Sequence, residues 1–463
     1  MRAVLAFALA LMSACSGRGA AVWVTTGDQQ KLLSREPDLS FSAGWSADFP
    51  IIEIADTGGF QEMVGFGAAL TDASAILING LPAEQRDLLL RELFDPDSGI
   101  GLSFTRLTIG ASDFSPNHYT FDDMPRGQRD PLLARFSIEP DRANRLPVVR
   151  RARAINPALT VMASPWSAPA WMKTTDRLIK GSLRPDAYEA FAEYLARYVD
   201  AYAAEGVPIF ALTIQNEPHF EPGDYPGMRV DPPARARFIG EFLGPRLARS
   251  GARTLIFDWD HNWDEPQSPL AVLRDSLARQ YVDGVAWHCY GGDVTAQSIV
   301  HDSFPAVDAY FTECSGGEWA PKFADNLVWN VQQLIIGTTR NWARGVLLWN
   351  LALDETHGPH LGGCGNCRGV VTIDSKSGAI TRNVEYYALA HASRFVKPGA
   401  RRVASSGPVE GLENVAFRNP DRSSVLIVVN TTAEPRQFSV RWRGRGLQYV
   451  LPPSAVATFR WSG

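Results

Sequence analysis

The sequence predicts a (β/α)8 TIM barrel with a β-sandwich domain beside it, and three observations support this prediction. Between residues 58 and 393, eight short apolar runs alternate with amphipathic segments. Nearly every one of these runs ends in a polar or aromatic residue. After residue 394 the pattern changes to short β-prone runs separated by turn residues. Alternating strands and helices are typical of a parallel sheet, and eight strands with converging polar ends describe a closed barrel.

The composition is that of an ordinary globular protein. Hydrophobic residues make up 45% of the 463 residues and charged residues 21%, so the chain can bury sizeable cores. The formal net charge of −5 gives no reason to expect nucleic acid or an anionic membrane surface as a partner. The sequence gives no indication of the oligomeric state.

Residues 1–20 are predicted to be an export signal. Arg2 precedes an apolar run at residues 3–12, and a Ser-Ala-Cys sequence ending at Cys15 follows. This is a charged region, a short apolar region and a small-residue cleavage zone. Cys15 also resembles the cysteine of a bacterial lipobox, although Met12 stands where that pattern usually has Leu. We therefore expect an exported protein, either periplasmic or secreted, or anchored to a bacterial membrane through a lipidated Cys15.

Further elements are predicted along the rest of the chain. Residues 21–57 carry β-prone runs at 21–26 and 51–54, which we expect to join the β-domain. The barrel, predicted at 58–393, takes its strands from apolar runs at 63–69, 104–109, 159–164, 211–214, 253–257, 284–287, 309–312 and 345–348. Its predicted helices are at 82–94, 141–155, 186–205, 233–249, 269–281 and 323–342. Residues 394–463 carry runs at 413–419, 424–431, 437–442 and 455–461, the spacing of a β-sandwich.

The helix predicted at 186–205 shows its pattern most clearly. Aromatic and apolar residues from Tyr188 to Tyr202 recur at spacings of three and four and so form one face. Asp186 is expected to cap this helix and Gly206 to end it. We assign its aromatic stripe to the core rather than to a sugar-binding surface.

The fourth predicted strand is the most informative stretch. The run at 211–214 leads through Gln215 into Asn216 and Glu217, and a proline then ends it. A run buried on both faces is typical of a parallel sheet, and its carboxyl end is where such folds place their chemistry. The seventh strand repeats the design, because its β-prone run ends in Glu313 before a small-residue turn.

Two strand-end carboxylates in one barrel are what glycoside hydrolysis needs. A retaining glycosidase places them about 5 to 5.5 Å apart, so that one protonates the leaving oxygen and the other attacks the anomeric carbon. Strands four and seven lie across a barrel from each other, so Glu217 and Glu313 can face each other at that range. The amide of Asn216 can hold a sugar 2-hydroxyl. Aromatic residues available to line the pocket, and so to raise the pKa of the acid, are Trp166, Tyr225, Tyr290 and Trp349.

Six segments carry a recognisable pattern. They begin at Gly65, Ser164, Asn216, Trp287, Thr312 and Trp349 and read GFGAALTD, SPWSAPAWMKT, NEP, WHCY, TECSG and WNLAL. In these residues and their order the chain resembles glycoside hydrolase family 30, most of all its glucosylceramidase-like branch. The resemblance implies a barrel fused to a β-domain and retaining chemistry, with Glu217 as acid/base and Glu313 as nucleophile. It also implies that the subsite for the non-reducing sugar is formed by Asp72, Trp166, Asn216, Tyr225, His288, Tyr290 and Trp349.

Two further residues are expected to support the site. Arg106 lies within the second predicted strand, where it either orients Glu217 or Glu313 or has a purely structural role. Asn350 follows Trp349 at the end of the eighth strand. From the residues alone, His288 could equally be a hydrogen-bonded core histidine.

The substrate is left open by two departures from the glucosylceramidase pattern. Cys289 stands where animal glucosylceramidases have Trp, and the loop at 362–369 resembles that of bacterial members and β-1,6-glucanases. We expect a retaining, exo-acting β-glucosidase that hydrolyses terminal β-glucosides, of glucosylceramidase type. An endo-β-1,6-glucanase of the same family is the alternative, and an alkyl or aryl glucoside is a further substrate to consider. A non-catalytic sugar-binding barrel is the alternative from another class, although the presence of both carboxylates argues against it.

Neither a cofactor nor a catalytic metal is expected. Asp258, Asp260 and His261 are close in sequence, but their spacing is not that of a known metal motif. Cys364 and Cys367 could form a disulfide, a redox motif or half a zinc site. A redox pair should open a helix and a zinc site needs a second matching pair, so we expect a loop-pinning disulfide, with free thiols as the alternative.

Overall fold

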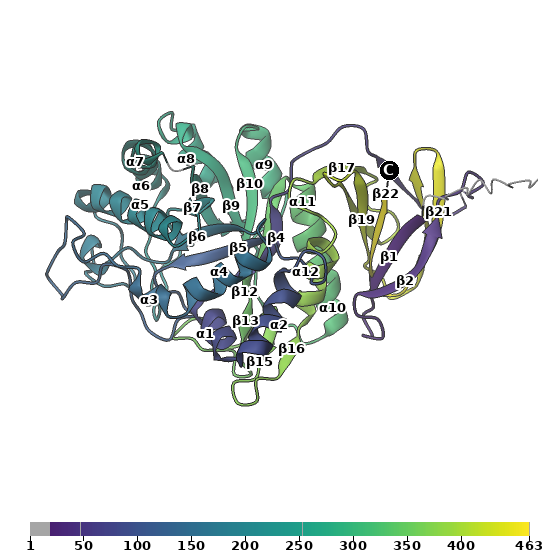
Figure 1. Cartoon of the computed structure of the whole chain (residues 1–463). Helices are drawn as coiled ribbons and strands as arrows, with labels where there is room; N and C mark the ends of the chain where they lie inside the picture. The colour runs from purple at the N-terminus through teal and green to yellow at the C-terminus, as the bar shows by residue number, and fades with distance from the viewer. Residues whose placement is uncertain (1–18, 47, 252, 463) are drawn as a thin grey trace, which may run out of the picture.

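Eight parallel strands close into a barrel in the structure, a computed structural model that describes residues 19–46, 48–251 and 253–462. The strands follow one another around the barrel in the order β4-β5-β6-β7-β8-β9-β10-β12, and β12 pairs with β4 (Figure 1). They span Gly65–Ala69 (β4), Phe104–Ile109 (β5), Thr160–Pro165 (β6), Ala211–Thr213 (β7), Leu255–Asn262 (β8), Val282–His288 (β9), Asp308–Glu313 (β10) and Ala343–Asn350 (β12). The predicted barrel is confirmed. β8 continues five residues beyond the predicted end of the fifth strand.

Large side chains fill the inside of the barrel. Phe104, Phe257 and Tyr310 belong to one buried cluster there, and the rings of Phe257 and Tyr310 stack with centroids 4.1 Å apart. A Cβ atom at Gly345 would come within 2.6 Å of the Phe104 ring, so only glycine fits at that position. Because the interior is packed with side chains, chemistry is confined to the end of the barrel.

Helices surround the barrel. They span Asp72–Gly80 (α1), Ala83–Phe94 (α2), Glu139–Arg142 (α3), Arg145–Ile155 (α4), Tyr188–Ala204 (α5), Pro232–Arg237 (α6), Gly244–Ser250 (α7), Gln267–Arg274 (α8), Ala296–Ser303 (α9), Phe323–Trp329 (α10), Thr338–Arg340 (α11) and Val384–Ser393 (α12). The helices predicted at 233–249 and 323–342 each contain a π-helical stretch, at Phe238–Leu243 and Asn330–Gly337. The expected cap of α5 is wrong, because Asp186 lies in a short turn before the helix and pairs with Arg184 instead.

The second unit is a β-sandwich built from both ends of the described chain. Its strands are ordered β2-β1-β22-β19-β18-β17-β3-β20-β21. They span Gly19–Thr25 (β1), Ser34–Ser40 (β2), Ile51–Ala55 (β3), Arg401–Ser405 (β17), Leu412–Arg418 (β18), Ser423–Asn430 (β19), Arg436–Trp442 (β20), Arg445–Leu451 (β21) and Val456–Ser462 (β22). β1 pairs antiparallel with β22, so N-terminal and C-terminal strands lie side by side (Figure 1). The predicted β-domain is confirmed.

Only some of the predictions for the N-terminal residues can be compared with the structure. Residues 1–18, with Cys15, lie outside the described residues, so the export signal and the lipid anchor stay predictions. β1 begins at Gly19 and Ala20 is fully buried, so the predicted signal boundary at residue 20 extends two residues into the first strand. The sequence pattern does not reveal β2, because SREPDLS has a single apolar residue besides its proline. Among the helices of the described residues, none combines the length and apolar character that crossing a membrane requires.

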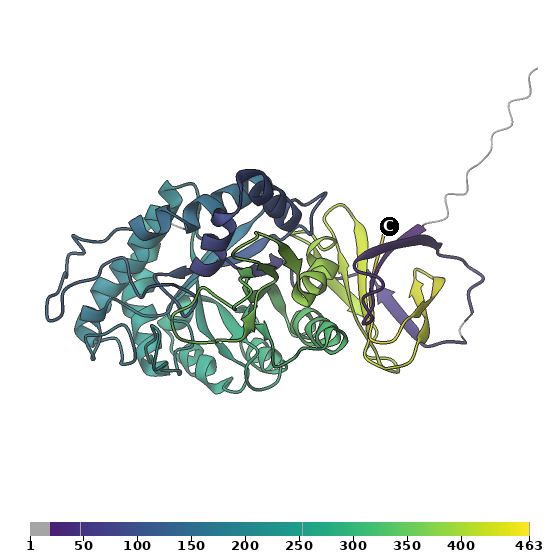
Figure 2. The same ribbon diagram turned by 90° about the horizontal axis from the view of Figure 1, so that it is seen from below.

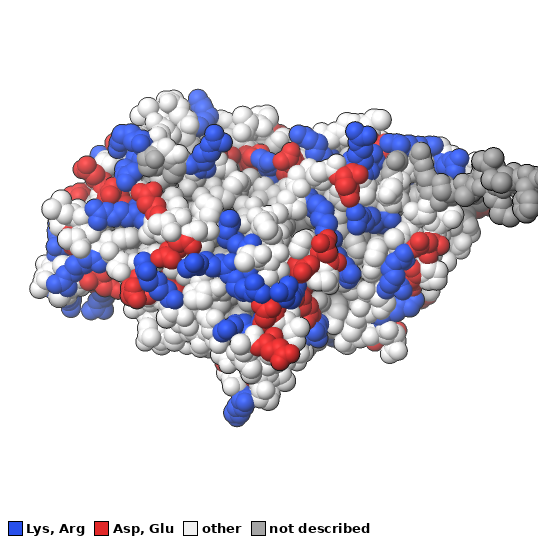
Figure 3. All heavy atoms as spheres, viewed as in Figure 1, with Lys and Arg blue, Asp and Glu red and all other residues white. Residues whose placement is uncertain are grey.

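The barrel and the β-domain share one core. Val415 of β18 and Ile427 of β19 belong to the same buried cluster as the barrel helices. α12 lies between the two units and contacts both β4 and β22 (Figure 1). The view from below shows the β-domain beside the barrel (Figure 2). On the face seen in Figure 3, basic and acidic side chains are interspersed, in keeping with the modest net charge.

His391 of α12 joins the two units by hydrogen bonds. Its Nδ1 lies 2.9 Å from the Oγ1 of Thr458 in β22, and its Nε2 lies 2.8 Å from the Oγ1 of Thr25 in β1. The ring is fully buried, and burial lowers its pKa to about 3. The imidazole is therefore neutral in the folded protein at any pH near neutrality.

We predict that His391 makes the protein less stable in acid. The unfolded chain has a histidine pKa near 6.5, so below that pH it binds a proton that the folded state rejects. Above about pH 6.5 this group does not lower the free energy of unfolding. Below that pH it lowers the free energy of unfolding by about 1.4 kcal/mol per pH unit, down to about pH 3. Urea unfolding between about pH 7 and 5 should show a shallower pH dependence for His391→Gln than for the wild type. Equal slopes would contradict the prediction.

Candidate active site

A cavity of about 580 Å3 opens at the carboxyl ends of the barrel strands, a size within the range of small-ligand sites. Glu217 and Glu313 both line it, so the two predicted carboxylates face one cavity. The remaining lining residues are Asp113, Phe220, Asp224, Tyr225, His261, Asn262, Tyr290, Ser315, Trp319, Trp349, Gly363, Cys364 and Cys367.

Glu217 leaves the line of its strand through an unusual backbone conformation. β7 ends at Thr213, and Glu217 has a φ of 47°. Its N–H donates to the carbonyl of Asp260 at 3.0 Å, and Asp260 itself has a φ of 56°. Non-glycine residues in this region cost about 1–3 kcal/mol and cluster at functional sites. The ends of β7 and β8 thus fix the position of Glu217 together.

Arg106 of β5 connects the two catalytic candidates. Its guanidinium is fully buried and donates from Nη1 to the carboxylate of Glu313. Its Nη2 donates to Asp260 Oδ2 and to Asn216 Oδ1, both at 2.7 Å. A buried guanidinium keeps its charge and holds carboxylates in fixed directions. These contacts favour the first of the two roles expected for Arg106, the orientation of a catalytic carboxylate.

Asp260 and His288 extend this network to Glu217. His288 places Nε2 3.1 Å from Asp260 Oδ1 and Nδ1 3.2 Å from Glu217 Oε1. Asp260 also accepts from the hydroxyls of Thr213 at 2.7 Å and Thr312 at 2.8 Å. The charged groups run without interruption from Glu217 through His288, Asp260 and Arg106 to Glu313.

The pKa values of this network depend on one another. Burial alone would raise the pKa of Asp260, but Arg106 and His288 hold it well below its usual range. Burial alone would lower the pKa of His288, but Glu313, Asp260 and Glu217 raise it to about 9. His288 is therefore an imidazolium at neutral pH, with both nitrogens directed at carboxylates.

The carboxylate pair titrates as one unit. Burial opposes ionisation of Glu217, but the hydrogen bond from His288 and nearby positive charges bring its pKa below the usual value. Burial raises the pKa of Glu313, helped by the charge of Glu217 and opposed by His288 and Arg106. Each negative charge disfavours the other, and the directions of these two pKa shifts favour a charged Glu217 and a protonated Glu313 in the free enzyme. A retaining reaction requires a protonated acid and a charged nucleophile, so Glu217 has to gain the proton before it can act as the acid.

The predicted sugar-binding residues take different places. Tyr225, Tyr290 and Trp349 line the cavity, and the Tyr290 hydroxyl donates to Glu313 Oε1 at 3.0 Å. Asn216 and His288 lie behind the carboxylates in the buried network.

Trp166 lies beneath the cavity. It stacks on Trp349 with ring centroids 5.0 Å apart, and the Arg106 guanidinium lies over both indoles. Asn350 also lies beneath the surface, where its Oδ1 accepts from Thr71 at the start of α1 at 2.8 Å. Trp166 and Asn350 therefore do not line the cavity, whereas the indoles of Trp349 and Trp319 do.

Asp72 and Asp113 differ in their surroundings. Asp72 accepts from Arg145 and Ser115 in a buried cluster and does not line the cavity. Asp113, after β5, does line it, and its buried Oδ1 has no hydrogen-bond partner among the described residues. Burial and the charges of Glu313 and Glu217 raise the pKa of Asp113 well above its usual value. The sequence feature that could have indicated Asp113 is its place shortly after the end of a strand, the same feature that indicates Glu217.

Two disulfides lie at the site. Cys364 bonds to Cys367, the pairing expected from the sequence, in the loop at the cavity edge. A second disulfide, Cys289–Cys314, does not follow from sequence spacing. It joins the residue after His288 to the residue after Glu313, so it crosslinks the two strand ends that carry these side chains.

Glu217, His261 and His288 place possible metal-ligand atoms within 4.8 Å of one another. Both nitrogens of His288 are hydrogen-bonded to carboxylates and its pKa is raised, so it lacks the lone pair that a metal ion needs. Glu217, His261 and His288 therefore do not fit a metal site.

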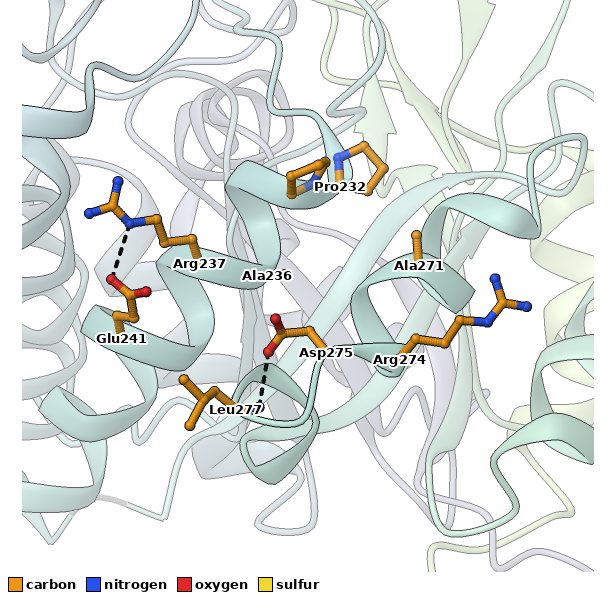
Figure 4. Close-up of a pocket in the computed structure, with 9 residues that line it drawn as sticks. Pro232, Ala236, Arg237, Glu241, Ala271, Arg274, Asp275 and Leu277 are labelled. Atoms are coloured by element: carbon orange, nitrogen blue, oxygen red, sulfur yellow. Dashed lines mark hydrogen bonds and ion pairs between the residues drawn. The ribbon is translucent and has the colours of Figure 1, made fainter.

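Another hollow lies between α6 and α8 on the outside of the barrel (Figure 4). Its Arg237 pairs with Glu241, and its Asp275 accepts from the N–H of Leu277. The dashed contacts in Figure 4 show that these charged groups are directed at local partners. The cavity at the strand ends is therefore the candidate active site.

A parallel barrel with two carboxylates on one cavity at its strand ends is the arrangement that glycoside hydrolysis needs. Residues 63–396 match the glycosyl hydrolase family 30 TIM-barrel domain, and residues 399–459 match the β-sandwich domain of that family. The chain belongs to glycoside hydrolase family 30 and is a retaining glycosidase.

Relatives within the family include enzymes of two kinds. The endo-1,6-β-D-glucanase neg1 of Aspergillus fumigatus is 37% identical over 434 residues, which cover 88% of this chain and 86% of the relative. The lysosomal acid glucosylceramidase of Mus musculus is 30% identical over 437 residues, covering 87% and 81%. A solved endo-β-1,6-glucanase is 32% identical with a TM-score of 0.89, covering 96% of this chain and 99% of the other. Membership of the family is shown, and the higher identities belong to glucanases.

We predict that Asp260→Asn lowers kcat about a hundredfold, a typical contribution of acid–base chemistry. Loss of this negative charge removes a cause of the raised pKa of His288, which should fall from about 9 toward its usual value. Histidine NMR titration and the pH dependence of kcat/KM report the two effects.

Thr312→Val serves as the milder variant, since it removes one hydroxyl donor to Asp260 and keeps the charge. It should show a smaller loss of kcat. Unchanged kcat together with an unchanged His288 titration in a folded Asp260→Asn protein would refute the role of the network.

Proposed function

We propose that the protein cleaves β-1,6-linked glucan internally, as an endo-β-1,6-glucanase. The observation that carries this proposal is the higher identity to endo-1,6-β-D-glucanases, 37% against 30% for the glucosylceramidase. The solved glucanase covers nearly the whole chain at a TM-score of 0.89, which supports the same choice. The expected exo-acting glucosylceramidase becomes the second candidate, favoured only by the family resemblance.

The reaction we propose is a double displacement. Glu313 attacks the anomeric carbon while Glu217 protonates the oxygen of the leaving chain, which gives a glycosyl ester on Glu313. Glu217 then takes a proton from water, and the water oxygen attacks the same carbon and releases the sugar. Arg106 and Tyr290 donate to Glu313 and stabilise the carboxylate that must leave in this second step.

We propose the following contacts for the sugar at the point of cleavage. Trp349 offers an aromatic face, and Tyr225 and Asp113 offer polar groups that line the same cavity. The unpartnered Oδ1 of Asp113 is an acceptor for a sugar hydroxyl. Asn216, held by Arg106, keeps the role of contacting the 2-hydroxyl.

We also propose that the protein acts outside the cytoplasm. The pattern at residues 1–20 supports export, and disulfides such as Cys289–Cys314 and Cys364–Cys367 persist in oxidising compartments. Whether Cys15 carries a lipid is a separate proposal, tested by mass measurement of the mature N-terminus.

We predict that β-1,6-glucan is the best of three substrates assayed side by side. With this polymer the enzyme should release oligosaccharides early, because internal cleavage precedes the appearance of glucose. Glucosylceramide and a nitrophenyl β-glucoside should be poor substrates, since they lack a glucosyl unit on the leaving side. Product chromatography over time provides the measurement.

The Glu313→Gln variant is the control, because it removes the proposed nucleophile with little change in shape. Rapid release of glucose from glucosylceramide, with no action on the polymer, would contradict the endo-β-1,6-glucanase proposal and support the glucosylceramidase alternative. Inertness toward all three would instead favour a non-catalytic barrel.

A further inference from the structure

The mouth of the cavity carries exposed aromatic rings that the proposed displacement does not use. Trp319 is 55% exposed and Phe220 is 47% exposed, and both line the cavity. Trp349, in contrast, is 3% exposed and lies deep. Exposed aromatic groups grouped at a cavity typically mark a binding surface. The cavity therefore has an inner aromatic ring and an outer aromatic rim.

Trp319 is fixed in place despite its exposure. Its indole packs against Gly317, where an added Cβ would come within 2.0 Å of the ring. Gly317 belongs to β11 (Gly316–Gly317), which pairs antiparallel with β14 (Cys367–Arg368). The N–H of Glu318, next to the tryptophan, donates to the carbonyl of Asn366 at 3.0 Å. Such a ring loses little freedom when a ligand stacks on it.

A buried ion pair anchors this small sheet to the barrel. Arg368 of β14 donates to Glu385 of α12 from Nε and Nη2, the latter at 2.7 Å, and the Glu385 side chain is 2% exposed. A Cβ at Gly316 would meet the same carboxylate, so the strand passes directly over it. The Cys364–Cys367 disulfide closes the adjoining loop. The exposed Trp319 thus lies in the segment that follows Glu313, and a strand pair, an ion pair and a disulfide brace this segment.

We propose that Trp319 is the platform for the first glucosyl ring of the leaving chain, and so makes the enzyme act on chains rather than on simple glucosides. This inference rests on the proposed function. The sugar under attack occupies the inner part of the cavity, between Glu217 and Glu313, so the ring joined to it reaches the mouth. The apolar face of a pyranose ring stacks on an indole, which is the surface that Trp319 presents.

The second half of the reaction tests this subsite by itself. The enzyme is first trapped as its 2-deoxy-2-fluoroglucosyl ester on Glu313, and gentiobiose, a β-1,6-linked diglucose, is then added. An acceptor hydroxyl attacks the anomeric carbon, the ester bond to Glu313 breaks, and the hydroxyl proton passes to Glu217. An acceptor that binds on the leaving side accelerates this recovery of active enzyme over recovery by water alone.

We predict that Trp319→Ala lowers the acceleration by gentiobiose about tenfold and leaves recovery by water unchanged. Trp319→Phe should be intermediate. The matched control is Trp329→Ala, since Trp329 on α10 is 41% exposed and does not line the cavity. It should recover as the wild type does.

The possible failures are distinct. Equal acceleration by gentiobiose in the wild type and in Trp319→Ala would overturn the role of Trp319 and leave the proposed function standing. A wild-type enzyme that gentiobiose does not accelerate would overturn both. A fall in recovery by water alone in Trp319→Ala would assign the residue to the chemistry rather than to the subsite.

Discussion

The buried guanidinium of Arg106 is the constraint on which the rest of the site depends. It is fully enclosed by the barrel and makes charged contacts with Glu313 and Asp260. Removing two carboxylates from water is unfavourable unless a positive charge compensates them. With Arg106 and the imidazolium of His288 in place, three carboxylates can share a small buried volume. The cavity can then hold a proton donor and a nucleophile next to each other.

The scaffold keeps this network rigid from several directions. The packed barrel interior closes the floor, and the left-handed backbone at Glu217 and Asp260 locks the ends of β7 and β8 together. The Cys289–Cys314 disulfide does the same for the ends of β9 and β10. Precision of this kind matters because small displacements of reacting groups cost large factors in rate. The outer loop with Trp319 is braced separately, by the ion pair between Arg368 and Glu385 of α12.

Much of this arrangement can be predicted from the sequence, and the misses have physical causes. Glu217 and Glu313 are predictable because each lies just past a β-prone run, at the strand end where barrels place their chemistry. From the sequence, Asp260 is considered only as a metal ligand. Its contacts with Arg106 and His288 cannot be predicted, because these partners lie on strands far apart in the sequence.

The remaining misses follow the same logic. The family resemblance implies Asp72 as a sugar-binding residue and gives no indication of Asp113, yet the oxygens of Asp72 accept from Arg145 and Ser115. The sequence does not reveal α12, because this helix is buried on nearly all sides and so lacks an amphipathic pattern. Pairwise contacts between distant segments, such as Cys289–Cys314, leave no mark on local spacing.

We propose that Glu313 is the nucleophile and that Glu217, linked to it through Arg106, Asp260 and His288, is the acid/base. Peptide mapping by mass spectrometry after reaction with a 2-deoxy-2-fluoroglucosyl fluoride tests it most directly. We expect one covalent label, on Glu313, and none in Glu313→Gln. A label on Glu217 or on any other residue would contradict it.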